Sequence, residues 1–150
     1  MLIVRRITHG IVGHFPIRIS EWTMIYPTIG MGLALKEQPD MFTTSQSFAT
    51  IQNIASEMTL SVIVLICALI RLIALVVNGT FRGFGISPHL RLFASMVGLV
   101  FWSQFALGFL DAALFKGGAW SAVIAYSTFV IFEYVNAYRS WSDVLRTHYK

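Results

Sequence analysis

The sequence predicts an all-α, polytopic integral membrane protein in which four transmembrane helices follow a short interfacial segment. Hydrophobic residues make up 56% of the 150-residue chain and charged residues 12%, so it is about half as charged as an average globular domain. Residues 58–77, which read MTLSVIVLICALIRLIALVV, have bilayer-spanning length and contain one formal charge, Arg71. Because the other apolar segments leave little room for a soluble domain, we expect a single membrane domain over residues 1–150.

Residues 1–19 combine aliphatic side chains with arginines and histidines, a mixture that suits a segment lying at the membrane surface. They contain no continuous apolar core followed by a cleavage site, so we expect no removable signal peptide. The first span is predicted at about residues 20–35, with Ser20 as N-cap and Glu21 in the first turn. It is short and contains Pro27. Residues 36–53 are predicted to form a polar connection on the solvent side.

The second span is predicted at about residues 54–77, and Asn78-Gly79 is typical of a helix end. The third span is predicted at residues 92–115 and the fourth at residues 119–138. Because only the glycine-rich turn after Lys116 separates them, these two spans should form an antiparallel hairpin. Residues 139–150 are predicted to be a polar cytoplasmic tail that continues as a short helix.

Basic residues are distributed unevenly between the two sides that four spans would define. Only Lys36 and Lys116 fall on the side of the first and third connections. Since short cytoplasmic loops carry an excess of lysine and arginine, we expect both termini to be cytoplasmic. The basic residues of the terminal side are Arg5, Arg6, Arg18, Arg82, Arg91, Arg139, Arg146 and Lys150.

Arg71 lies within the second predicted span, where a charge costs roughly 2.5–3.5 kcal/mol on insertion scales. Two interpretations are open. Its long side chain can extend to the head groups, because Arg71 is seven residues from the expected helix end at Asn78. Alternatively, it pairs with another span, and Glu133 of the fourth span lies at a similar depth. We predict an Arg71–Glu133 pair, which is more often a structural clasp than a proton or ion path.

Other residues in the predicted spans are candidates for polar contacts or close helix packing. The secondary polar positions are Asn78, Gln104, Asp111 and Asn136. Pairs of small residues four positions apart allow helix backbones to approach closely. These pairs are Gly30 with Ala34, Ala94 with Gly98, and Gly108 with Ala112.

The motifs of several functional classes are missing from the sequence. We expect no haem site, because the four histidines fall outside the predicted spans. The sequence has no metal-binding or nucleophile motif, so we predict no cofactor, no metal and no catalytic residues. The basic residues are scattered near the ends of apolar segments, which favours contact with lipid head groups over nucleic-acid binding.

Several short patterns stand out along the chain: SEW at residues 20–22, RLIALVVNG at residues 71–79, Arg82, SPHLR at residues 87–91 and FWSQFALG at residues 101–108. Together they resemble small membrane proteins encoded by bacteriophages and prophages of proteobacteria. The resemblance covers about residues 20–140 and implies a location in the bacterial inner membrane of the host cell. It implies no mechanism that can be carried over residue by residue.

Three functional classes remain open at this point. The first is a non-enzymatic, phage-type membrane protein that self-associates or docks on a membrane-protein partner through its small-residue helix faces. The second is a pore-forming or ion-conducting protein, including a holin-like one, in which an oligomer would expose Gln104, Asp111 and Arg71 to a lumen. The third, a membrane enzyme or electron-transfer subunit, has the least support. We predict the first class.

Overall fold

The computed structural model describes the backbone of residues 2–80 and 85–148, and within these ranges it describes all side chains except those of residues 2, 6, 46, 49, 50, 78–80, 147 and 148. All secondary structure in the described ranges is helical, as predicted. The elements are α1 (Leu2–His14), a 3₁₀ turn (Pro16–Arg18), α2 (Ile19–Glu37), α3 (Met41–Thr44), a 3₁₀ turn (Gln46–Phe48), α4 (Ala49–Gln52), α5 (Glu57–Thr80), α6 (Ser87–Phe115) and α7 (Trp120–His148).

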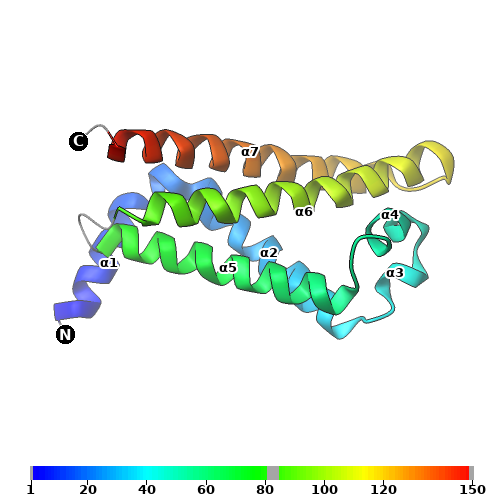
Figure 1. Cartoon of the computed structure of the whole chain (residues 1–150), viewed down its shortest axis with the longest axis horizontal. Coiled ribbons are helices and arrows are strands. Elements are labelled where there is room, and N and C mark those ends of the chain that lie inside the picture. The colour runs from blue at the N-terminus through cyan, green and yellow to red at the C-terminus, as the bar shows by residue number, and fades with distance from the viewer. Residues whose placement is uncertain (1, 81–84, 149–150) are drawn as a thin grey trace.

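Four long helices, α2, α5, α6 and α7, form an elongated bundle (Figure 1). α5 packs against both α2 and α6, α7 packs against α6 and α2, and α1 packs on α5. The start of α1 and the end of α7 lie at one end of the bundle, which we call the terminal end (Figure 1). The segment that joins α2 to α5 lies at the opposite end.

α6 and α7 form the predicted antiparallel hairpin, and a tight turn joins them (Figure 1). The N–H groups of Lys116 and Gly118 both donate to the carbonyl of Ala112, each over 2.9 Å. Gly117 has a φ of 70°, a left-handed conformation that glycine adopts without the steric cost of a Cβ. The glycines after Lys116 thus end α6 and reverse the chain.

One predicted helix end is wrong, because α5 continues further. α5 runs through Asn78 and Gly79 to Thr80, since one glycine in a last turn costs only about 1 kcal/mol relative to alanine. α7 is one helix from Trp120 to His148. The chain is thus helical beyond residue 138, as predicted for the tail, and the end of the fourth span at residue 138 stays a prediction. Ala137, Ser140 and Val144 are buried. They lie three and four residues apart, so one face of α7 continues to pack on the bundle.

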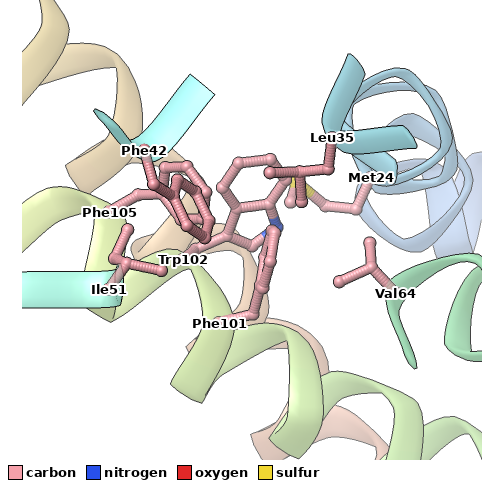
Figure 2. Packing of buried hydrophobic residues seen from close by; sticks show 8 residues of the cluster. All are labelled: Met24, Leu35, Phe42, Ile51, Val64, Phe101, Trp102 and Phe105. Atoms are coloured by element: carbon pink, nitrogen blue, oxygen red, sulfur yellow. The ribbon is translucent and has the colours of Figure 1, made fainter. Parts of the chain in front are cut away.

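The connection between α2 and α5 has mostly exposed polar side chains, as its composition predicted, but it also contributes to the core. Its Phe42 and Ile51 are buried in a cluster with residues of the long helices (Figure 2). The Phe42 N–H donates to Glu57 Oε1 over 3.1 Å, which ties the connection to the start of α5. The other members of the cluster are Met24 and Leu35 of α2, Val64 of α5, and Phe101, Trp102 and Phe105 of α6.

Many large apolar side chains of the long helices are exposed, among them Ile66 of α5, Val100 of α6 and Ile131 of α7. Within the described residues, two helices are long and apolar enough to cross a membrane: residues 57–77 of α5, and α6. α2 and α7 do not meet this criterion. α2 is long enough but contains Glu21, Pro27 and Lys36, which lower its mean hydropathy, and α7 carries Glu133 and Asn136 in its middle. Four spans therefore stay a prediction.

Candidate functional site

Arg71 and Glu133, the predicted pair, are in contact inside the bundle. Arg71 Nη1 donates to Glu133 Oε1 over 2.7 Å and Arg71 Nη2 donates to Oε2 over 2.6 Å. This bidentate geometry is the most specific way in which arginine binds a carboxylate. The two side chains are 3% and 0% exposed. In this arrangement the guanidinium lies in the interior and neutralises the carboxylate, so it does not extend to the surface.

α6 provides the space in which this pair fits. Ser95 Oγ lies 3.5 Å from Arg71 Nη2 and accepts a weak hydrogen bond. A Cβ at Gly98 would lie 2.5 Å from Glu133 Oε1 and 2.7 Å from Glu133 Cδ. Gly98 was predicted as a packing residue, and its specific role is to make room for the carboxylate. The pair therefore involves three helices, with α5 and α7 supplying the charges and α6 the small residues beside them.

A second group of charges, which was not predicted from the sequence, joins α2, α6 and α7 near the terminal end. Arg91 Nε donates to Glu21 Oε2 and Arg91 Nη2 donates to Glu21 Oε1, both over 2.6 Å. Both side chains are almost completely buried. Arg91 Nη1 donates to Asp143 Oδ2 over 3.0 Å. One arginine of α6 thus connects the first turn of α2 to the last third of α7.

Arg18 completes this group, which we call the four-charge cluster: Arg18, Glu21, Arg91 and Asp143. Arg18 Nη2 donates to Asp143 Oδ2 over 3.0 Å, and Arg18 Nη1 lies 3.3 Å from Glu21 Oε1. Two arginines face two carboxylates, so the formal charges sum to zero. Burial of charges is tolerated when they are paired in this way, because each ion replaces the water that the other has lost.

The sequence contained a signal for the four-charge cluster. Glu21 and Asp143 are the two acidic residues that lie on the predicted cytoplasmic side, while several arginines surround them in the same region. In the predicted topology, Arg18 and Arg91 are basic residues of the cytoplasmic side, and Glu21 is a residue of the first helical turn. No ion pair was therefore predicted between the acidic residues and the arginines of this region, although they lie at similar depth on different helices.

Asn136, a predicted polar position, connects α7 to α2. Ser20 Oγ donates to Asn136 Oδ1 over 2.6 Å, and the Asn136 side chain is buried. Two further serine hydroxyls join helices through backbone carbonyls. Ser61 Oγ donates to the Gly32 carbonyl over 2.7 Å, and Ser87 Oγ donates to the Ala74 carbonyl over 2.9 Å.

The other predicted polar positions do not join either charged group. Asp111 forms an exposed ion pair with Lys116, 2.9 Å away at the end of α6. Gln104 is half-buried and makes no hydrogen bond within the described part of the chain. The side chain of Asn78 lies outside the described residues.

The predicted packing residues differ in how deeply they are buried and in what they contact. Ala94 and Ala112 are buried. Gly108 is buried but lies against the backbone of Ser47, so it contacts the α2–α5 connection and not a long helix. Ala34 is half-buried.

The prediction for Gly30 is wrong for packing within this chain. A Cβ at Gly30 would meet no atom within 4 Å. The close approach of α2 to α5 occurs at Gly32, where a Cβ would lie 2.7 Å from two side-chain atoms of Leu65. Gly30 and Gly32 point in different directions around the helix, and spacing alone could not identify which of the two faces α5.

An apolar groove of about 510 Å³ runs between α5 and α6. Gln104 is the one polar side chain among its lining residues. The groove is lined by Ile51, Ile54, Leu60, Ile63, Phe93, Met96, Val97, Val100, Phe101, Gln104 and Phe105.

The two charged groups hold helices together, and their chemistry is that of structural ion pairs. Each of the three carboxylates accepts hydrogen bonds from at least one arginine. Within the described residues, no three side chains of histidine, cysteine, aspartate or glutamate come close enough to bind a metal ion. The groups therefore fix the relative positions of α2, α5, α6 and α7.

Comparison of the chain with protein-family models, curated proteins and solved structures found no match.

Proposed function

We propose that this protein is a non-enzymatic integral membrane protein whose four long helices cross the bilayer with both termini in the cytoplasm, and that it self-associates there. One observation carries the proposal: two groups of charged side chains are paired in the interior of the bundle, while large apolar side chains are exposed along α5, α6 and α7. Water-soluble domains have the opposite distribution. In a bilayer, each charge must face the bundle interior and find a partner.

The positions of the basic residues support the proposed topology. Arg5, Arg18, Arg91 and Arg146 belong to elements that meet at the terminal end of the bundle (Figure 1). Short cytoplasmic segments are enriched in arginine and lysine. Orienting the bundle with this end in the cytoplasm places the α2–α5 connection and the α6–α7 turn on the other side.

The surface of α6 supports self-association. Phe93, Val100, Leu107 and Leu114 are each more than half exposed, and their seven-residue spacing is the repeat along which a further helix packs. Gln104 borders this stripe, four residues after Val100. Apolar side chains alone give little net attraction between helices in lipid, because the lipid is equally apolar. An amide that can hydrogen-bond supplies the missing attraction.

A second copy of this chain is the partner that best fits Gln104. Its amide has both a donor and an acceptor, so two copies related by a two-fold axis can satisfy one another with the same side chain. Polar side chains of this kind contribute about 0.6–2 kcal/mol to helix association in membranes. We therefore place the proposed homodimer contact along the exposed stripe of α6.

Dilution in lipid vesicles tests this contact. We expect Gln104→Leu to shift the monomer–dimer equilibrium toward monomer by about three- to thirtyfold, from the energy range of such hydrogen bonds. Thr128→Val is the matched control, since the Thr128 hydroxyl already donates to the Ile124 carbonyl within α7. The measurement is single-molecule photobleaching at a series of protein-to-lipid ratios. Equal dimer fractions for both variants would contradict the proposed contact.

A holin-like pore is the alternative, and membrane potential distinguishes it. Arg71, which a pore would have to expose, is buried against Glu133. We expect induction in bacteria to leave the membrane potential unchanged for at least one generation. Prompt depolarisation would contradict a non-conducting role and would favour the pore.

A further inference from the structure

A partly polar cavity of about 220 Å³ lies near the terminal end of the bundle, between the segment before α2 and the last third of α7. Arg18, Arg139, Ser142, Asp143 and Arg146 are in its wall. It is separate from the apolar groove between α5 and α6, which has a different set of lining residues.

The charges around this cavity do not cancel. Asp143 is already engaged by Arg18 and Arg91, and together with Glu21 these residues form the neutral four-charge cluster. Arg139 donates through Nη2 to the carbonyl of Ile17, which carries no formal charge. Arg146 is exposed and forms no ion pair within the described part of the chain. Arg139 and Arg146 thus add two guanidinium groups to the wall of the cavity, and neither forms an ion pair within the described part of the chain.

The surface of α7 next to the cavity is apolar on its membrane side. Ile131, Val135 and Tyr138 are exposed and lie four and three residues apart, so they form one stripe along the helix. Ser142 and Arg146 continue this stripe in steps of four residues, into the cavity. A ligand that matches both parts needs an anionic group at one end and a hydrocarbon chain at the other.

We propose that this cavity binds the phosphate of an anionic phospholipid in the cytoplasmic leaflet, with Arg139 and Arg146 as the charge partners and the acyl chain along the α7 stripe. Guanidinium groups bind phosphate oxygens through two hydrogen bonds at once. Basic pockets at the cytoplasmic ends of membrane helices are suited to such head groups. This inference rests on the proposed membrane orientation, but it does not require self-association.

Native mass spectrometry of the whole protein in a neutral detergent tests the proposal. The probes are phosphatidylglycerol, phosphatidylcholine and, as a soluble phosphate, glycerol 3-phosphate. We expect phosphatidylglycerol to bind at least tenfold more tightly than phosphatidylcholine. Arg146→Gln should weaken phosphatidylglycerol binding about tenfold, the effect of losing one charge-assisted hydrogen bond. The variant should fold normally because Arg146 has no ion-pair partner in the described part of the chain.

The control is Arg5→Gln, which removes the same charge from an exposed position on α1. It should change phosphatidylglycerol binding by less than about twofold. Equal weakening by both variants would overturn the proposal, because it would mean diffuse attraction of the basic end. Displacement of the lipid by an equal concentration of glycerol 3-phosphate would also overturn it, in favour of a soluble phosphate. Failure here with an intact membrane topology would leave the proposed function standing.

Discussion

Arg71 and Glu133 bring opposite charges into an interior where neither has access to water. The two hydrogen bonds between them replace the lost hydration only while both partners are present. Removing one residue of such a pair leaves a buried charge without compensation, at a cost of roughly 3–5 kcal/mol, whereas replacing both with apolar residues is often neutral or stabilising. The contribution of the pair is therefore measured by comparing single with double substitutions.

We expect Arg71→Leu and Glu133→Leu each to lower the free energy of unfolding by roughly 3–5 kcal/mol. The double variant should lie within about 2 kcal/mol of the original protein, because no unpaired charge remains. Unfolding in a neutral detergent and accumulation in the membrane are the measurements. Lys116→Gln, which breaks the exposed pair with Asp111, serves as control and should change stability by at most about 1 kcal/mol.

We expect the effects of the two substitutions on the free energy of unfolding not to add, so the double variant should be more stable than either single variant. A double variant as unstable as the sum of the two single variants would mean that Arg71 and Glu133 act independently. The buried pair would then have to be abandoned as an explanation for their positions.

At the scale of the helices, the close contact between α6 and α7 depends on the lack of a Cβ at Gly98. Gly98→Ala would place a Cβ 2.5 Å from Glu133 Oε1, and the Arg71 contact prevents the carboxylate from moving away freely. We expect a loss of about 1–3 kcal/mol, the usual cost of overpacking an interior. Thermal unfolding in detergent measures it.

Gly30→Ala is the matched control, because it makes the same substitution in a helix where a Cβ meets nothing within 4 Å. Alanine stabilises a helix by roughly 0.5–1 kcal/mol relative to glycine, so this variant should be neutral or slightly stabilised. If both alanine variants behaved alike, the tight contact at Gly98 would not be the cause of the destabilisation.

The position of a residue along its helix could be predicted from the sequence better than the direction in which its side chain points around the helix axis. Arg71 and Glu133 each lie a fixed number of turns from a helix end, so their equal depth followed from a rise of about 1.5 Å per residue. The choice between Gly30 and Gly32 depends on how α2 is rotated against α5, which the packing of both helices decides. The Arg91–Glu21 pair could not be predicted for a similar reason, since it depends on how α2 and α6 are rotated so that the two side chains meet.

Composition predicted the polar character of the α2–α5 connection, but not which of its side chains are buried. The segment is rich in polar residues, but its Phe42 and Ile51 are buried against the long helices because the connection folds back on the bundle end (Figure 2). Composition describes an average over a segment, whereas burial depends on the few side chains that reach the core. The α2–α5 connection therefore belongs to the packed structure.

At the scale of the whole molecule, the two ends of the bundle differ in composition. The terminal end holds the four-charge cluster and the basic cavity, and the other end holds the aromatic core with Phe42, Phe101 and Phe105. A bundle with one basic end has a preferred orientation in a membrane, because translocating arginines and lysines is unfavourable. The orientation can therefore be tested independently of helix number.

Cysteine labelling in a Cys67→Ala background tests this orientation, since Cys67 is the chain's one cysteine and is buried. Gln52→Cys on α4 and Thr8→Cys on α1 are exposed positions in elements at opposite ends of the bundle (Figure 1). In intact spheroplasts, a membrane-impermeant maleimide should label Gln52→Cys, while Thr8→Cys should react only after permeabilisation. The reverse pattern would place the termini outside the cytoplasm, against the charge bias. Labelling of both sites in intact spheroplasts would mean that α2 and α5 do not separate the two ends by a membrane, so the proposed four-span topology would be wrong.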